Sequence, residues 1–418
     1  MKTLRIGFAV LSATLMVLAY SSRPAAFHSG GVAECNGCHS MHAAKSVGGL
    51  LLVGSDQSST CLVCHQSAND PGPTRYHMST PLAELPDGTA PKQMTPGGDF
   101  GWLRRDYSWS PRTGTTEHDY GYNRGHNIIA ADNGYTVDTA NVTAPGGGAF
   151  ASSKLGCQSC HDPHGRARRL SNGSYVNAIY TPGSTNAPII GSGSYNNSAD
   201  PAAGEAVGVY RLLRAAGDNS QGVTFTAAPI AVAPATYNQS EVTNEVRVAY
   251  GNDNAGNTWG AWCGTCHPTM HSTAKTVHPV DKTMEDVYMN YNAYVKSGDL
   301  TGALATGYTS LVPFVESTGD IAVLKSHSSN TGAYKLGASS SDQVSCVSCH
   351  RAHASGFPDM LRFSMTYEFM VYNGTYTGNA GSKMGRTESE LEAAYYGRPA
   401  TRFAKYQRVL CNKCHAKD

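Results

Sequence analysis

The amino-acid sequence predicts a chain that is mostly coil, with few short α-helices and minimal β-structure, wrapped around bound prosthetic groups. Two observations support this fold class. Glycine accounts for 45 of 418 residues and hydrophobic residues for only 40%, and long apolar runs with helical or strand periodicity are rare. In addition, all 12 cysteines fall in six short motifs of one kind. A chain this poor in apolar residues needs another source of apolar surface for its core.

Each motif is Cys-x-x-Cys-His. In chain order, the first to sixth motifs are Cys35-Cys38-His39, Cys61-Cys64-His65, Cys157-Cys160-His161, Cys263-Cys266-His267, Cys346-Cys349-His350 and Cys411-Cys414-His415. This spacing suits covalent haem, because two cysteines form thioethers with the two vinyl groups and the next residue brings an imidazole to the iron. We therefore expect a multihaem c-type cytochrome in which the chain surrounds a continuous row of six covalently bound haem c groups. The six motif histidines are the expected proximal ligands.

Zinc sites and disulfides are the alternatives for paired cysteines. Cys-x-x-Cys units also build four-cysteine zinc sites, and thiol–disulfide chemistry uses the same spacing. Neither requires a histidine directly after every pair. The chain has 16 histidines, and one follows each of the six pairs, so haem attachment explains the pattern best.

Residues 1–26 have the features of a secretory signal peptide, with a basic start and an apolar run too short to span a membrane comfortably. A retained anchor helix is the alternative. Removal of this segment would leave residues 27–418 as a single hexahaem domain, with a loose division near residues 190–204 between two three-haem halves. No later segment predicts a transmembrane span. We expect a protein that is secreted through the periplasm to the extracellular space or the outer cell surface.

The charge balance excludes one class of partner. The chain carries 32 basic and 31 acidic side chains and a formal charge of +1, which is not the basic surface of a nucleic-acid-binding protein. Two propionates on each of six haems would change this charge to about −11. The assembled protein is therefore expected to be acidic.

Five segments show recognisable secondary-structure patterns. Residues 223–232 and 245–250 predict strands that could pair as a hairpin. Residues 281–296 place apolar side chains near one face of a helix. Residues 387–390 match a capping box that opens a helix toward residue 396, and residues 402–410 predict a helix that delivers the sixth motif.

Ten histidines remain after the proximal set, whereas six closed irons need only six distal ligands. The candidates are His28, His42, His77, His126, His164, His271, His278, His327 and His353. His118 lies in a polar run and is expected to be spare. Methionine could replace histidine and would raise the reduction potential. With so many histidines available, ligation by two histidines and low potentials are favoured.

Three candidates, His42, His164 and His353, follow a proximal histidine by three residues, and His271 follows one by four. Residues three apart on a helical turn advance only about 4.5 Å along the axis, so the second imidazole cannot reach the opposite face of its own haem. It binds a different iron or none. Where it binds a neighbour, one short segment holds two haems close together, and this favours fast electron transfer.

Several segments carry a resemblance to a known family. They are residues 27–35, 94–102, 157–165, 346–356 and 411–418. These segments resemble the outer-surface cytochrome S family, the filament-forming hexahaem c-type cytochromes, or extracellular nanowires, of metal-reducing bacteria. The resemblance covers nearly the whole chain after residue 26.

The resemblance implies polymerisation into a filament with an unbroken row of bis-histidine haems. It also implies that His42 ligates the haem of Cys346, Cys349 and His350 in the adjoining subunit. The expected function is extracellular electron transfer to acceptors such as metal oxides or partner cells, with other multihaem cytochromes as further partners. A multihaem reductase of a small oxyanion, which needs an open iron, and a monomeric periplasmic electron shuttle are the alternatives.

Overall fold

A computed structural model of the protein describes residues 35–46, 50–67, 76–110, 114–178, 187–253, 256–270, 278–378 and 385–415. The signal peptide expected at residues 1–26 and the candidate ligands His28 and His271 lie outside these residues. The single-domain organisation and its division near residues 190–204 stay predictions.

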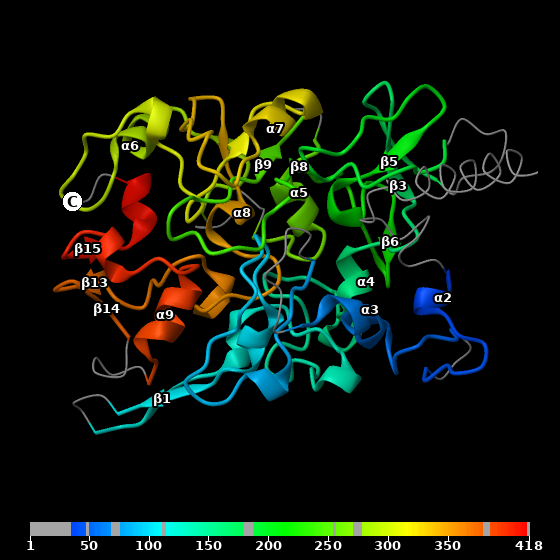
Figure 1. Ribbon diagram of the computed structural model, residues 1–418, viewed down its shortest axis with the longest axis horizontal. Coiled ribbons are helices and arrows are strands. Elements are labelled where there is room, and N and C mark those ends of the chain that lie inside the picture. Colours follow the sequence, from blue (N-terminus) through cyan, green and yellow to red (C-terminus); the bar gives the residue numbers. More distant parts are fainter. Residues whose placement is uncertain are drawn as a thin grey trace, which may run out of the picture.

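Irregular backbone predominates among the described residues, which confirms the predicted fold class (Figure 1). The α-helices are α2 (Cys35–Cys38), α3 (Gln57–His65), α4 (Cys157–Cys160), α5 (Trp259–Gly264), α6 (Val287–Ala293), α7 (Ile321–His327), α8 (Cys346–Cys349) and α9 (Glu388–Ala394). Single turns of 3-10 helix include η2 (Phe100–Arg104), η6 (Tyr210–Leu212), η8 (Pro358–Met360), η10 (Ala400–Arg402) and η11 (Leu410–Lys413). No helix in this part of the chain combines the length and the apolar character needed to cross a bilayer.

The strands are short and form small separate sheets. They are β1 (Tyr107–Trp109), β2 (Glu117–Asp119), β3 (Ala167–Leu170), β4 (Tyr175–Asn177), β5 (Ala206–Gly208), β6 (Asn219–Ser220), β7 (Val223–Thr224), β8 (Ile230–Val232), β9 (Ala249–Gly251), β10 (Lys282–Thr283), β11 (Val315–Glu316), β12 (Gln343–Val344), β13 (Phe369–Tyr372), β14 (Thr375–Tyr376) and β15 (Gln407–Arg408). The five-stranded sheet has the order β10-β12-β11-β9-β8, and the three-stranded sheets are β14-β13-β15 and β4-β3-β5. β1 pairs with β2, and β6 pairs with β7.

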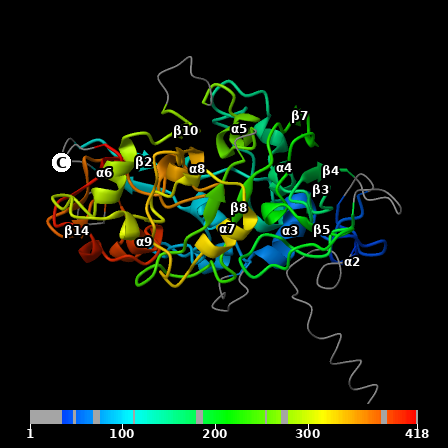
Figure 2. The same ribbon diagram turned by 90° about the horizontal axis from the view of Figure 1, so that it is seen from above.

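The elements that carry the cysteine motifs follow one another along the long axis of the molecule. Figure 1 shows α2 at one end, α3 and α4 next, α5 and α8 near the centre, and the red segment that contains β15 and η11 toward the opposite end. The view turned by 90° gives the same order (Figure 2). The motifs are therefore arranged in space roughly as they are in sequence.

Local side-chain bonds start the helices that contain the motifs. The Asp56 carboxylate accepts a bond of 2.7 Å from the Ser59 amide at the start of α3. Before α5, the Thr258 hydroxyl accepts one of 3.1 Å from the Ala261 amide. Such caps satisfy amides that have no partner inside the helix, so these short helices begin at defined residues.

The buried apolar side chains form several clusters, and motif cysteines lie at their edges. The largest cluster includes Tyr291, Tyr376 and Tyr395 and packs against Cys411 and Cys414. A second contains Trp259 and Trp262 and packs against Cys160 and Cys263. A third contains Leu62 and packs against Cys157. The apolar core is thus divided among the motifs, as expected for a chain whose prosthetic groups supply the remaining apolar surface.

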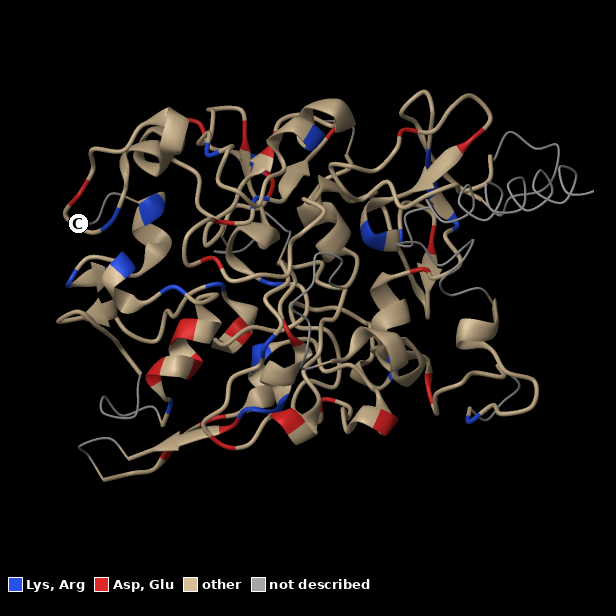
Figure 3. Ribbon diagram, viewed as in Figure 1, with Lys and Arg blue, Asp and Glu red and all other residues tan. Residues whose placement is uncertain are grey.

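Several buried arginines are paired with carboxylates. Arg105 donates to Glu390 at 2.7 Å, and Arg247 donates to Glu316 at 2.8 Å. Burial of a charge is tolerated only where a partner compensates for the lost hydration. Over the described residues, acidic and basic residues are interspersed (Figure 3), in line with the formal charge of +1.

The capping-box prediction is confirmed. Thr387 caps α9, its hydroxyl accepts from the Glu390 amide at 3.2 Å, and the Glu390 carboxylate accepts from the Thr387 amide at 2.8 Å. The helix ends at Ala394, two residues before the predicted end.

The helix predicted over residues 402–410 is wrong. This segment begins at the end of η10, continues into β15 and reaches the start of η11. Gln407 is fully buried and donates to the Tyr294 hydroxyl at 2.7 Å, while β15 pairs with β13. These long-range contacts override the local helical preference.

The remaining predictions hold in part. The helix over residues 281–296 is reduced to α6, because residues 282–283 pair with β12 and Asp281 and Glu285 have positive φ angles of 57° and 44°. The strand over residues 223–232 is divided into β7 and β8. β8 pairs with β9 in antiparallel register, Ile230 opposite Gly251, so the predicted pairing is correct although the strands are shorter.

Candidate functional site

The two cysteines of each motif lie on one short turn. α2, α4 and α8 each consist of a motif from its first to its second cysteine. In α4 and α8 the serine between the cysteines closes the turn: Ser159 accepts from the Gly156 amide at 3.0 Å, and Ser348 from the Ser345 amide at 3.1 Å. All 12 cysteines are outside disulfides, so each pair is available for thioether formation.

The proximal imidazoles are oriented by backbone carbonyls. In five motifs the Nδ1–H donates to a carbonyl oxygen. The pairs are His39 with Leu50 at 2.9 Å, His65 with Tyr76 at 2.8 Å, His161 with Arg211 at 2.8 Å, His267 with Pro145 at 2.9 Å and His350 with Asp359 at 2.6 Å. A bond at Nδ1 fixes the tautomer and leaves the lone pair of Nε2 for a metal. The donor set therefore fits haem iron.

Four proximal imidazoles face a second imidazole from elsewhere in the chain. The ring centres are 6.4 Å apart for His39 and His164, 6.3 Å for His161 and His353, 6.1 Å for His126 and His267, and 6.2 Å for His278 and His415. A bond from a metal to an imidazole nitrogen is about 2 Å long, so two imidazoles on opposite sides of one metal have ring centres roughly 6 Å apart. The separations match this arrangement.

Burial keeps several of these imidazoles neutral. Burial, followed by repulsion from His161, lowers the pKa of His353 to about 3. Burial, followed by repulsion from His267, lowers the pKa of His126 to about 4. Because a neutral imidazole is the form that binds a metal, these side chains are ready to act as ligands at neutral pH.

The third motif is held by a segment far along the chain, which we call a carbonyl clip. The clip comprises residues 211–213. His161 Nδ1 donates to the Arg211 carbonyl, the Asp162 amide donates to the Leu212 carbonyl at 2.8 Å, and His161 forms an antiparallel bridge with Leu213. Arg211 and Leu212 have φ angles of 55° and 52°. Such angles cost a non-glycine residue about 1–2 kcal/mol, so the contacts of the clip hold them in place.

The fifth motif has the same clip, formed by residues 359–361. His350 Nδ1 donates to the Asp359 carbonyl, the Arg351 amide donates to the Met360 carbonyl at 2.8 Å, and His350 bridges Leu361. Asp359 and Met360 have φ angles of 56° and 58°. The backbone geometry of the third motif is thus reproduced.

The first motif has the clip as well, formed by residues 50–52. His39 Nδ1 donates to the Leu50 carbonyl, the Ser40 amide donates to the Leu51 carbonyl at 2.6 Å, and His39 bridges Leu52. Leu51 has a φ angle of 53°. The first, third and fifth motifs are therefore copies of one structural unit, and each also has a histidine three residues after its proximal histidine.

The second histidine of this unit faces the preceding copy of the unit. His164, from the third motif, lies opposite His39 of the first motif, and His353, from the fifth, lies opposite His161 of the third. The equivalent residue of the first motif, His42, is exposed. The same step, in which the second histidine of one clipped motif faces the proximal histidine of the preceding clipped motif, thus occurs twice within the chain.

The cysteines show that consecutive motifs are neighbours. Cys61 of the second motif donates a hydrogen bond to Cys157 of the third, and Cys263 of the fourth donates to Cys346 of the fifth. Each bond raises the pKa of the donor thiol. A thioether does not titrate, so these effects matter only as evidence that the sulfurs are close.

Electrostatic effects between cysteines show that the three remaining pairs of consecutive motifs are also neighbours. Burial, followed by the nearby charges of Cys61 and Cys64, raises the pKa of Cys38. Burial and then Cys266 raise the pKa of Cys160 to about 12. The same effect links the fifth and sixth motifs, because burial and then the charge on the first cysteine of the sixth motif raise the pKa of Cys349 to about 11. Every motif therefore has its neighbour in sequence as a neighbour in space.

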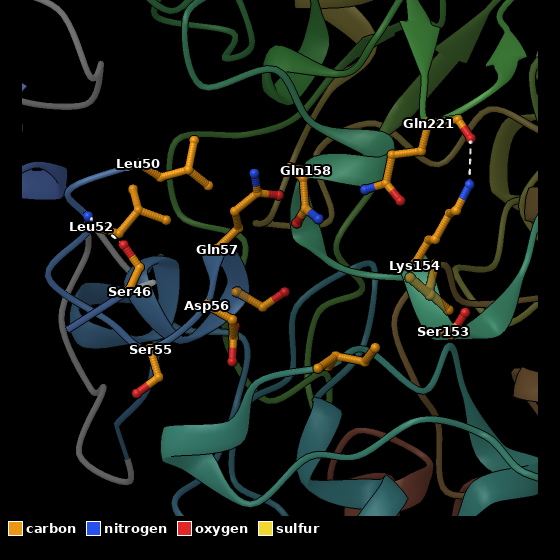
Figure 4. Close-up of a pocket in the computed structure, with 13 residues that line it drawn as sticks. Ser46, Leu50, Leu52, Ser55, Asp56, Gln57, Ser153, Lys154, Gln158 and Gln221 are labelled. Carbon is orange, nitrogen blue, oxygen red and sulfur yellow. Dashed lines mark hydrogen bonds between the residues drawn. The ribbon is translucent and has the colours of Figure 1, made fainter. Parts of the chain in front are cut away.

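A cavity of about 360 Å³ lies between the first clip and the third motif. Leu50 and Leu52 line one side, and Gln158, between the cysteines of the third motif, lies on the other (Figure 4). This cavity belongs to the region of the first three motifs.

The remaining candidate histidines have different surroundings. His327 Nδ1 lies 2.5 Å from a Glu316 carboxylate oxygen, and its ring stacks on Tyr334 at 4.1 Å. His77 is partly buried beside Tyr76, with ring centres 4.8 Å apart. His118 is exposed and bonded to the Ser108 hydroxyl at 2.9 Å.

Sequence reasoning missed the three clips. Their only common signal is a pair of long apolar residues directly after the residue whose carbonyl accepts the bond: Leu51-Leu52, Leu212-Leu213 and Met360-Leu361. Such pairs are frequent in proteins, and the distance from motif to clip varies from 9 to 50 residues. The clips become recognisable only from their backbone geometry.

Comparisons with known proteins identify close relatives. No family model matches the chain. The chain is 46% identical to C-type cytochrome OmcS of Geobacter sulfurreducens over an alignment of 449 residues that covers 100% of both chains. Its structure is similar to that of the OmcS nanowires of the same organism, with a TM-score of 0.83 and 45% identity over 94% of this chain and 100% of that one. The outer membrane cytochrome S filament of that organism gives a TM-score of 0.83 and 46% identity over the same shares.

Proposed function

The chain belongs to the family of C-type cytochrome OmcS, and we propose that it is an extracellular electron-transfer protein that polymerises into conductive filaments. Its role is electron transport, not turnover of a substrate, and its acceptors are external ones such as metal oxides or partner cells. The observation that carries this proposal is the repeated step from one clipped motif to the preceding one.

Six haem c groups are held by the twelve motif cysteines, and the six motif histidines supply the proximal nitrogens. Bound haem supplies one-electron redox chemistry. The protein binds and orients the groups, and the carbonyl acceptors keep five of the six proximal imidazoles in the metal-binding tautomer. The contacts between cysteines of consecutive motifs support a linear order from the first site to the sixth.

The facing imidazoles support distal ligands for four sites. They are His164 for the first site, His353 for the third, His126 for the fourth and His278 for the sixth. His28, His77 and His271 are the candidates for the second site. His327 and His118 are spare.

His42 ligates the fifth site of the adjoining subunit. The third motif donates its second histidine toward the first, and the fifth donates toward the third. If the same step continues from one subunit to the next, the first motif of the adjoining subunit lies beside the fifth motif of this one. His42 of the adjoining subunit then lies opposite His350. A head-to-tail contact of this kind does not close on itself and generates a filament. The bis-histidine row then continues from subunit to subunit.

Substitution of His42 tests this proposal. His42→Ala should keep six haems by intact mass, because all cysteines remain, but should not form filaments visible by electron microscopy. About one iron in six should lose an imidazole and show a high-spin signal in electron paramagnetic resonance. Wild-type protein dissociated into monomers should show the same fraction. The matched control is His118→Ala, a histidine that is also exposed, which should form normal filaments.

Two results would contradict the proposal. Normal filaments of His42→Ala with six low-spin irons would exclude ligation between subunits. Fewer than six haems on the wild-type chain would exclude the hexahaem assignment itself.

A further inference from the structure

The three carbonyl clips share their backbone but differ in the charge of one side chain. The residue whose carbonyl accepts the proximal Nδ1–H is Leu50 in the clip of the first motif, Arg211 in that of the third motif and Asp359 in that of the fifth motif. The hydrogen bond to the proximal imidazole is therefore the same in kind at all three sites. A neutral, a positive and a negative side chain occupy equivalent places next to three proximal ligands.

Arg211 carries its charge in an aromatic enclosure. The guanidinium carbon lies 3.9 Å from the ring centre of Tyr237, 4.8 Å from that of Tyr195 and 5.4 Å from that of Tyr210. Its Nη1 donates to the Tyr195 hydroxyl at 3.1 Å. Among the described residues, no carboxylate forms an ion pair with it. Ring faces stabilise a cation without cancelling its charge.

This charge belongs to the residue that contacts the proximal imidazole of the third site. Arg211 is bonded through its own carbonyl to His161. By contrast, Asp359 is exposed, so water and salt screen its charge.

We propose that Arg211 is a potential-determining residue, which raises the reduction potential of the third haem site above those of the other clipped sites. This inference rests on the proposed function. Reduction of a bis-histidine haem adds one electron and lowers the charge at the iron by one. A fixed positive charge in a medium of low dielectric stabilises the reduced form relative to the oxidised form.

The tyrosines position this charge. Tyr195, Tyr210 and Tyr237 hold the guanidinium while the positive φ of Arg211 aims its carbonyl at His161. The backbone role and the charge role of this residue are therefore separable, because a substitution of the side chain can keep the carbonyl in place.

Redox titration of three variants tests the proposal. Arg211→Gln removes the charge, Arg211→Lys retains it, and Asp359→Asn removes the exposed charge at the equivalent position. In spectroelectrochemical titrations of the assembled protein, Arg211→Gln should move about one sixth of the absorbance change to lower potential, since one site of six is affected. Arg211→Lys should follow the wild-type curve more closely than Arg211→Gln does. Asp359→Asn should shift its site less than Arg211→Gln shifts the third.

Haem content by intact mass and spin state by electron paramagnetic resonance, measured on the same samples, separate this inference from the proposed function. With six low-spin haems in wild type and variants, an Arg211→Gln curve that superimposes on the wild-type curve would overturn the role of Arg211. Equal shifts for Arg211→Gln and Arg211→Lys would also overturn it, because they would indicate disturbed packing and not charge. A wild-type protein with fewer haems would instead defeat the proposed function.

Discussion

The imidazole of His164 lies with its ring centre 6.4 Å from that of His39, and the two ring planes are inclined by only 12°. His164 follows the proximal histidine of the third motif by three residues, but it faces the proximal histidine of the first. One short segment thus supplies side chains to two sites. The same relationship between His353 and His161 shows that it is a property of the repeated unit.

Removal of this second histidine should affect one site without loss of haem. We expect His164→Ala to keep six covalent haems and to convert one iron from low to high spin, because the first site loses its distal imidazole. Electron paramagnetic resonance and visible spectra check this result. His118→Ala is the control and should leave the spectra unchanged. A fully low-spin His164→Ala protein would show that His164 is not a ligand.

His327 should contribute to stability and not to ligation. It is bonded to Glu316, which also binds Arg247, and it stacks on Tyr334. His327→Phe keeps an aromatic ring but removes the hydrogen bond to Glu316, and we expect a loss of about 1–3 kcal/mol in the free energy of unfolding. The haem spectrum should not change. A new high-spin signal in this variant would contradict the assignment.

Gly98 should not tolerate a side chain. Its φ angle is 94°, and a Cβ atom there would lie 1.7 Å from the carbonyl oxygen of Ala354, directly after His353. We expect Gly98→Ala to cost more than about 3 kcal/mol of stability, from the clash and from backbone strain. Gly173 has a φ angle of 83° but open space around it, so Gly173→Ala should cost only about 1–2 kcal/mol. Thermal unfolding of the two variants compares the effects, and equal losses would mean that the clash is relieved.

Glu390 should stabilise the fold at neutral pH and lose this effect in acid. Burial raises the pKa of Glu390, but bonds from the Thr387 amide, Arg105 and Tyr107 outweigh it and lower the pKa overall. The stabilisation is therefore present above the unfolded pKa of about 4.3 and is lost as the pH falls through the folded value. Glu390→Gln should be less stable than wild type by about 3 kcal/mol at pH 7.

This difference between wild type and Glu390→Gln should shrink below about pH 4.3. Thermal unfolding of both proteins at several pH values measures it. A difference that stays constant with pH would show that the charge of Glu390 does not contribute.

The surface around His42 should be part of the subunit contact. Met41 is 79% exposed, and Leu50 in the first clip is 50% exposed. Charged residues are rare at the core of a protein interface, and exposed apolar side chains are common there. Met41→Asp should therefore weaken filament formation while haem content stays at six, whereas Met41→Leu should assemble normally. Electron microscopy and intact mass check both variants, and normal filaments of Met41→Asp would place Met41 outside the contact.

Part of the architecture could be predicted from local sequence alone. The coil-rich fold follows from the glycine content and the scarcity of periodic apolar segments. The helix α9 follows from Thr387 and Glu390, which bond to each other's backbone three residues apart. Residues 402–410 show where local reasoning fails. The side chain of Gln407 is buried against Tyr294, and β15 pairs with β13, so partners distant in sequence decide the conformation.

The sequence by itself predicts the chemistry: twelve cysteines and six adjacent histidines indicate covalent haem, because thioether formation and axial ligation depend on spacings of a few residues. Only the tertiary structure decided which imidazoles face one another and which carbonyls hold them. His126 and His267 are 141 positions apart in the chain, yet their ring centres are 6.1 Å apart. Such a pairing depends on how the coil is folded by buried contacts between distant segments, and no local pattern of residues records it.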